Sequence, residues 1–231
     1  MQLIYLFTVF ALFITLISSF QTCERYVANT YLYLLTSLLF IFSFIKYFET
    51  NSDADTKVGN VYTNYILIFA LCYIALFILI LFTPSNYLIA KHLLWLVFIF
   101  MSAILMYNLI KGKDDEVVRS TLLLTTILFG AASVIAVIYK DSLEDKRFTG
   151  LMIGVFIGLA VLSAFIQKGT PLSKAITIAI LAILCYSVVI DTKDLLIKQH
   201  NCVIPDYIDE SAGFFVTIQN IFSRLITLQS D

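Results

Sequence analysis

An aspartate stands where an apolar segment of this chain ends. Residues 186–190 are apolar or weakly polar, and Asp191 follows them directly. A charged side chain costs roughly 2.5–3.5 kcal/mol at the centre of a membrane-spanning helix, and less toward its ends. Such groups persist in membranes because they face a protein interior or a water-filled path. Asp191 is therefore the first candidate for an ion pathway or gate.

A polar stripe on the last apolar segment supplies a candidate partner for this acid. Gly213, Thr217, Asn220 and Arg224 are spaced by four, three and four residues, which places them on one face of a helix. Because polar groups face lipid at a cost, we expect the stripe to face the bundle. Asp191 should then lie within hydrogen-bonding or water-bridged reach of it.

A second interpretation of Asp191 stays open. Thr192, Lys193 and Asp194 follow it, so the acid could equally be a solvated helix end at the level of the lipid headgroups.

Composition fixes the class of protein. Apolar residues make up 60% of the 231 and charged residues only 13%, whereas a soluble domain has roughly 45–50% and 25%. The chain is an integral membrane protein, and its length suits one helical bundle. The net charge of −1 gives no reason to expect a nucleic-acid partner.

Uncharged runs separated by charged residues predict eight membrane-spanning helices. They cover residues 1–20, 27–45, 61–83, 93–110, 120–139, 148–166, 175–190 and 211–228. The fourth helix is expected to begin earlier, near Tyr87, and the last is more polar than the others. Basic residues divide almost evenly between the two sides, so the positive-inside rule assigns no orientation.

Residues 1–20 form an apolar run in front of the rest. Without a basic start or a clear cleavage site, the run is a poor signal peptide. We expect a retained extra helix or uncleaved anchor outside a bundle formed by residues 21–231. A cleaved signal ending near Ser18 and Ser19 is the alternative.

Glycines predict how one helix packs. Gly150, Gly154 and Gly158 recur every four residues in the run 148–166, a spacing that lets neighbouring backbones approach closely. We expect intramolecular packing that makes this helix, with the run 175–190, among the most enclosed. A homodimer face is the alternative.

The helix that begins near residue 175 should extend beyond the membrane to about Lys198. Asp194 and Lys198 form an i,i+4 pair of favourable polarity. Pro205 disfavours helical geometry in the residue before it, so residues 201–205 should break the helix.

Nothing in the sequence predicts an enzyme, a cofactor or a resident metal. The histidines lack zinc-binding spacing, and no span pairs a nucleophile with a base. Cys72 and Cys185 lie inside spans and are expected to be packing residues. Cys23 and Cys202 lie in loops that would share a side of the membrane, and a disulfide could join them in an oxidising lumen.

Several motifs, in order along the chain, resemble the Bax inhibitor-1 family, also called the transmembrane Bax inhibitor motif or lifeguard family. Residues 190–193 read Ile-Asp-Thr-Lys where the family has a Tyr-Asp-Thr-Gln-like motif. Residues 206–208 read Asp-Tyr-Ile, like the start of the next family helix. Residues 217–225 read Thr-Ile-Gln-Asn-Ile-Phe-Ser-Arg-Leu where the family has Asp-x-x-Asn-Leu-Phe-x-x-Leu. Residues 91–95, Lys-His-Leu-Leu-Trp, are similar to the growth-hormone-inducible transmembrane branch.

The resemblance implies an all-α, seven-helix membrane bundle, here with the additional N-terminal hydrophobic helix. It also implies a pH-sensitive calcium leak linked to protection from cell death, with two aspartates sharing a proton at the gate. Here Asp191 keeps the first position, but Thr217 stands at the second and cannot share charge. Either another acid such as Asp206 or Glu210 compensates, or the protein has lost gating and kept the scaffold.

Two functions therefore compete. The first is a calcium-leak channel or cell-death suppressor, with Asp191, Thr217 and Asn220 lining its pore and calcium as a transient ion. If Arg224 pairs with Asp191, the pore would depend only weakly on pH. The second is a non-conducting structural or partner-binding subunit of a larger membrane assembly. Either would sit in the lipid bilayer of an intracellular membrane, in the ER, the Golgi or the inner mitochondrial membrane.

Overall fold

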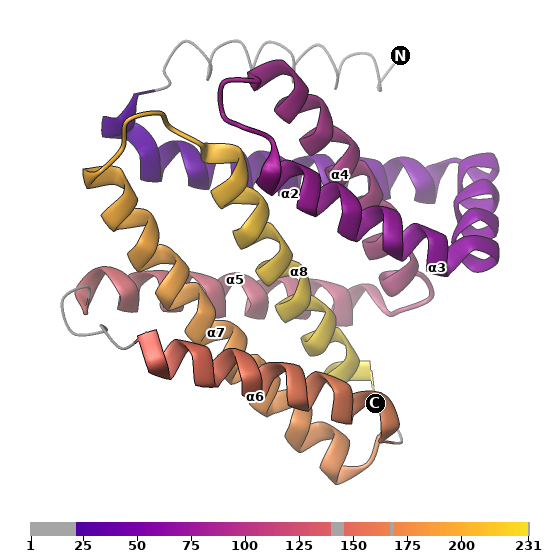
Figure 1. Ribbon diagram of the computed structural model, residues 1–231. Helices are drawn as coiled ribbons and strands as arrows, with labels where there is room; N and C mark the ends of the chain where they lie inside the picture. The colour runs from indigo at the N-terminus through magenta and orange to yellow at the C-terminus, as the bar shows by residue number, and fades with distance from the viewer. Residues whose placement is uncertain (1–21, 140–145, 167–168, 231) are drawn as a thin grey trace.

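The computed structural model describes residues 22–139, 146–166 and 169–230, and these are helical with no strand. The predicted all-α class is confirmed. The elements, in order, are η1 (Cys23–Arg25), α2 (Tyr26–Thr50), α3 (Ser52–Phe82), α4 (Leu88–Ile110), α5 (Asp115–Ile138), α6 (Lys146–Phe165), α7 (Pro171–His200) and α8 (Tyr207–Ser230) (Figure 1). The predicted helix at residues 1–20 lies outside the described residues.

Five described helices are long and apolar enough to cross a membrane. Their candidate spans are Cys23–Thr50, Tyr65–Phe82, Ile89–Ile110, Asp115–Ile138 and Pro171–His200. α6 has a shorter apolar stretch, Gly154–Ser163. α8 is not in this set, which agrees with the more polar sequence expected of it. The chain is a multi-pass membrane protein.

Local side chains fix where the helices start. The side chain of Asn51 caps α3 by accepting from Ala54 N, and Asp114 caps α5 by accepting from Glu116 N. Thr170 caps α7, with Pro171 at the first helical position. α4 begins one residue after Tyr87, as predicted.

The predicted extension of α7 is confirmed. The helix runs to His200, and residues 201–206 leave helical geometry before α8 begins at Tyr207. The last turn of α7 is held differently than predicted. The Lys198 ammonium forms its ion pair with Glu210 of α8 at 2.5 Å, and not with Asp194. The turn between the two helices thus brings an α8 acid closer to Lys198 than Asp194.

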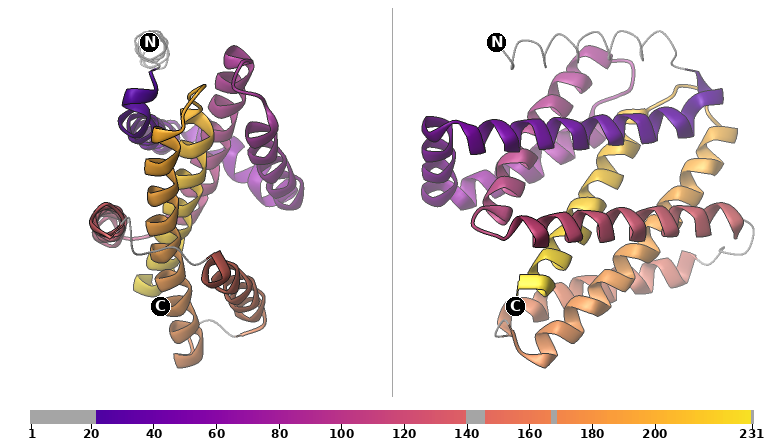
Figure 2. Two further views of the ribbon diagram at one scale, coloured as in Figure 1. Left: turned by 60° about the vertical axis from the view of Figure 1, so that its left-hand side comes forward. Right: turned by 180° about the vertical axis from the view of Figure 1, so that it is seen from behind.

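α8 lies at the centre of the bundle. It packs against α2, α3, α4, α5 and α7, and Figure 2 shows α7 and α8 running through the middle of the molecule. Its side chains Phe214, Phe215, Ile221 and Phe222 are almost fully buried. Among the described α-helices, the one with the fewest apolar residues thus packs against the most other α-helices. A half-polar surface suits a helix that is shielded from lipid.

The predicted enclosure of the glycine-bearing helix is wrong. Among the described helices α6 packs substantially only against α7. Gly154 and Gly158 are exposed, and a Cβ added at either would meet nothing within 4 Å. The surroundings of Gly150 lie outside what the structure describes. α6 is peripheral because α5 and α8 already cover the rest of α7, which is enclosed as expected.

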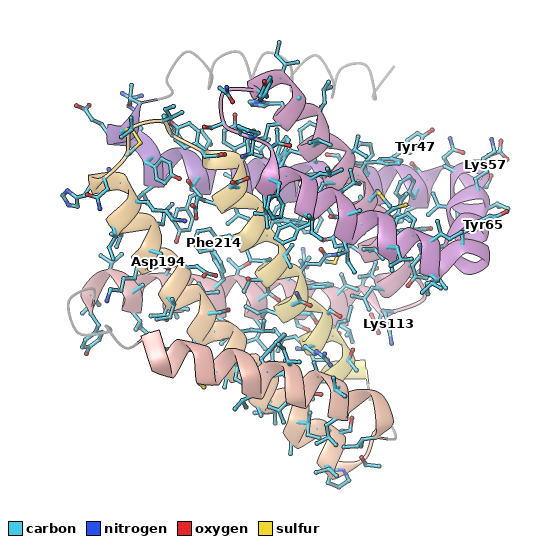
Figure 3. The ribbon with its side chains drawn as sticks, viewed as in Figure 1. Tyr47, Lys57, Tyr65, Lys113, Asp194 and Phe214 are labelled. Atoms are coloured by element: carbon cyan, nitrogen blue, oxygen red, sulfur yellow. A yellow bond between two sulfur atoms is a disulfide. The ribbon has the colours of Figure 1, made fainter. Side chains whose placement is uncertain are left out.

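The bundle has two distinct ends. We call the end where α2, α4 and α8 begin the disulfide end, because a disulfide there joins Cys23 to Cys202. The other end, where α3, α5 and α7 begin, is called the far end. In Figure 3, Lys57 and Lys113 lie toward the far end, while Asp194 lies toward the disulfide end. Cys72 and Cys185 are free thiols.

The disulfide predicts a thiol count. Alkylation of the denatured protein without reductant should modify two cysteines, Cys72 and Cys185, and four after reduction. Peptide mass spectrometry would locate the modified sites. Four modified cysteines before reduction, in protein purified from its native membrane, would contradict the pairing.

Candidate functional site

A polar cavity opens between α3, α4 and α8, from mid-bundle toward the far end. Its volume is about 550 Å³. Polar side chains form much of its wall, among them Asn108, Lys113, Asn220, Ser223 and Thr227. Polar groups at membrane depth normally line water-filled space or face one another. The cavity is therefore suited to hold water or ions inside the bundle.

Hydrogen bonds close the inner end of this cavity. The Tyr73 hydroxyl on α3 donates to Gln219 Oε1 on α8 at 2.7 Å, and Ser102 Oγ on α4 lies 3.4 Å from the same hydroxyl. The Tyr73 ring stacks on Phe98, with ring centroids 4.9 Å apart. We call Tyr73, Ser102 and Gln219 the central barrier, because they join three helices at the cavity's inner end.

An aromatic layer continues from the barrier toward the disulfide end. Phe98, Phe214 and Phe215 are each at most 1% exposed. The Phe98 and Phe215 rings meet edge to face with centroids 5.8 Å apart. A dry layer of this kind blocks ions, because it offers no group to replace their hydration shell.

A buried ion cluster lies beyond this layer, at the disulfide end. The Lys91 side chain on α4 is 1% exposed, and its ammonium binds Asp206 and lies 2.7 Å from Asp209 Oδ1. It also donates to the carbonyl of Thr83 at 3.0 Å. The bond to Asp206 has hydrogen-bond geometry, whereas Asp209 Oδ1 has no hydrogen-bond partner. We call Lys91, Asp206 and Asp209 the ion cluster.

Further contacts hold the same end together. The Tyr26 hydroxyl donates to the Asp206 carbonyl, and the Tyr207 hydroxyl donates to the Thr22 carbonyl. The Tyr33 hydroxyl lies 2.7 Å from His92 Nε2. With the disulfide, these contacts join α2, α4 and the start of α8.

The predicted site residues are not brought together. Asp191 lines a small cavity of about 210 Å³ between α6 and α7. The side chains of Thr217 and Asn220 bond to carbonyls of their own helix, those of Gly213 and Val216. Within the described residues no hydrogen bond or ion pair joins Asp191 to Thr217, Asn220 or Arg224. Of this set, Asn220 lines the polar cavity. The expected direct contact is wrong because Asp191 faces α6, not α8.

The two compensating acids have other partners. Asp206 binds Lys91 and Glu210 binds Lys198. Glu210 does lie within electrostatic range of Asp191. In the described part of the chain, no group of three or more histidine, cysteine or acidic residues could hold a metal ion.

Sequence reasoning missed the ion cluster and the central barrier. Lys91 carried a signal, because a lysine within an apolar run requires a buried anion or carbonyl as partner. Asp206 and Asp209, three residues apart at the start of a helix, were natural candidates. Tyr73 and Gln219 gave no comparable signal, because tyrosine and glutamine are ordinary on a helix of unknown orientation.

These helices and this interior cavity define a multi-pass α-helical membrane protein. Residues 23–230 match the family described as "Inhibitor of apoptosis-promoting Bax1", so the chain belongs to the Bax inhibitor-1 family. Comparisons with curated proteins and with solved structures find no match.

The two acids of the ion cluster should respond oppositely to neutralisation. Burial raises the pKa of Asp209 to about 6, against the opposing effect of Lys91, and the Asp206 carboxylate adds to the rise. A raised acid pKa means that the folded protein binds this proton more tightly than the unfolded one. The resulting stability is complete below about pH 4 and is lost as the pH rises through 6.

Asp209→Asn should therefore raise the melting temperature at pH 7.5. The gain in the free energy of unfolding should be at most on the order of 2–3 kcal/mol at that pH and smaller at pH 5. Asp206→Asn should lower the melting temperature at both pH values. The loss in the free energy of unfolding should approach the roughly 3–5 kcal/mol that a broken buried ion pair costs. Thermal unfolding in detergent measures both. Equal losses for the two variants at pH 7.5 would contradict the unequal roles.

Proposed function

We propose that the protein is a closed but openable leak pathway for small cations, calcium among them, along α8. The observation that carries the proposal is the polar cavity of about 550 Å³ that reaches mid-bundle. A polar cavity at that depth would shorten the dry part of any ion path to the central barrier and the aromatic layer. Family membership agrees with this function, since the resemblance implies a calcium leak.

The central barrier is the proposed closure. Opening requires the Tyr73 hydroxyl on α3 to leave Gln219 on α8, which separates two helices that flank the cavity. The ion cluster fixes the start of α8 and so limits how far that helix can tilt. In this proposal the two features replace the aspartate pair, and Asp191 lies off the path.

The disulfide supports a compartment proposal. Disulfides persist where the surroundings are oxidising, so the Cys23–Cys202 bond favours an oxidising compartment for the disulfide end. We place the far end in the cytosol or matrix, and the protein in an intracellular membrane.

A second function is favoured by one observation. Among the described residues that line the cavity, Lys113 is the only charged one, and none carries a carboxylate. Cation pathways are usually lined by acids, whereas lysine and arginine favour anions. A non-conducting protein that binds membrane partners would tolerate this arrangement.

Calcium flux into liposomes that contain the purified protein separates the two functions. Tyr73→Phe keeps the ring on Phe98 but removes the hydroxyl that holds Gln219, so flux should rise several-fold. Losing one buried hydrogen bond weakens the closure by about 1 kcal/mol, which is roughly a fivefold effect. Tyr62→Phe is the matched control, because Tyr62 lines the same cavity but makes no described hydrogen bond.

Two further variants complete the test. Lys113→Gln should raise cation flux by removing the repelling charge, and Asp191→Asn should leave it unchanged. If the wild type, Tyr73→Phe and Lys113→Gln all conduct no more than empty liposomes, the non-conducting function is the better one. A large loss of flux in Asp191→Asn would indicate that Asp191 on α7 is part of the gate, which contradicts the proposed closure at Tyr73 and Gln219.

A further inference from the structure

An apolar groove lies on the lipid-facing side of the bundle, between α2 and α5. Two adjoining cavities of about 350 and 190 Å³ form it, and Leu38, Thr125, Thr126 and Ile218 line both. The larger one alone reaches the size of ordinary ligand sites, about 300–1,000 Å³. The groove is separate from the polar cavity but adjoins it.

The groove exists because two helices share a neighbour and meet each other only near the disulfide end. α2 and α5 each pack along α8, and the Tyr31 hydroxyl on α2 donates to Ser133 Oγ on α5 at 3.1 Å, beyond the groove. The right view of Figure 2 shows them running alongside one another across α7 and α8. The floor of the groove is formed by buried side chains of α8, namely Phe215, Ile218 and Phe222.

The chemistry of the groove matches a hydrocarbon chain. Its polar members are two threonines, Gln219 and Tyr31, and the hydroxyls of Thr125 and Thr126 already donate to Thr121 and Leu122 carbonyls of their own helix. The Tyr31 hydroxyl likewise donates to Ser133 Oγ. Phe42 and Leu123 on the rim are 43% and 63% exposed. Since α2 and α5 are both candidate spans, this rim faces lipid chains, not water.

A free cation marks the far-end mouth of the groove. Arg119 follows Val118, a lining residue, and stands three and seven residues before the lining residues Leu122 and Thr126. This spacing puts Arg119 on the groove side of α5. It is exposed and has no ion pair or hydrogen bond within the described residues. The acids Asp115 and Glu116 lie in the turn before it, toward the α4–α5 loop.

We propose that this groove is a binding site for one phospholipid. An acyl chain lies between α2 and α5, and the phosphate of an anionic headgroup binds Arg119, whose guanidinium suits bidentate phosphate contacts. Met106 and Gln219 line both the groove and the polar cavity. The bound chain therefore touches the wall that carries the central barrier. The site itself does not depend on whether the protein conducts.

Native mass spectrometry of the full chain in detergent, with added phosphatidylglycerol or phosphatidylcholine, tests the site. The wild type should retain one phosphatidylglycerol in preference to phosphatidylcholine. Leu123→Trp fills the rim and should lower retention of both lipids by about tenfold, a change of about 1.4 kcal/mol. Ile135→Trp is the matched control, because Ile135 is similarly apolar, is 46% exposed and lines neither cavity of the groove.

The headgroup contact has its own variant. Arg119→Gln should abolish the preference for phosphatidylglycerol while leaving phosphatidylcholine bound, and Lys57→Gln, an exposed lysine on α3, should change neither. Equal retention by Leu123→Trp and Ile135→Trp overturns the site. So does a stable dimer that Leu123→Trp alone disrupts, because a second copy would then occupy the groove. An unchanged preference in Arg119→Gln overturns the phosphate contact.

Discussion

The arrangement of the bundle depends on one buried cation. The Lys91 side chain is 1% exposed, so its charge must be balanced, and the Asp206 carboxylate just before α8 does this, with Asp209 close by. Removing Asp206 from such a pair is costly, so α4 and the start of α8 cannot separate at the disulfide end without rearranging it. The Cys23–Cys202 bond joins η1 to the chain just before α8. The start of α8 is thereby fixed at the centre of the bundle, and its remaining turns define what the interior can do.

Two sides of α8 then meet two different environments. One carries Asn220, Ser223 and Thr227 into the polar cavity, and the other carries Phe215, Ile218 and Phe222 to the floor of the apolar groove. Gln219 lines both the polar cavity and the apolar groove. Its side-chain oxygen Oε1 accepts the hydrogen bond from Tyr73 that closes the cavity. A helix with these sides is too polar for lipid and too apolar for water. Its central place, with neighbours on nearly every side, satisfies both requirements.

Hydropathy and helix-end signals predicted the described helices well, because these signals are local. α7 ended at His200, just before the residues 201–205 where a break was expected, and Tyr87 preceded α4. The site was predicted poorly, because it depends on which helices face each other. Periodicity placed Thr217 and Asn220 on one face but could not show that Asp191 faces α6. Small residues such as Gly154 and Gly158 permit close packing of a helix without requiring it. Because α5 and α8 already cover most of α7, α6 stays at the periphery. Lys91 was an interior residue whose charge demanded a distant partner, and Asp206 supplies it.

The central claim is that water reaches along α8 from the far end only as far as the central barrier. Two serines of this helix test it as a matched pair, in a background with Cys72 and Cys185 replaced by serine. Ser223 lines the cavity, whereas Ser211 is 0% exposed beyond the barrier. A membrane-impermeant thiol reagent added at the far end should label Ser223→Cys quickly and Ser211→Cys hardly at all. An unreactive Ser223→Cys in folded protein, or equal labelling of both positions, would contradict the account.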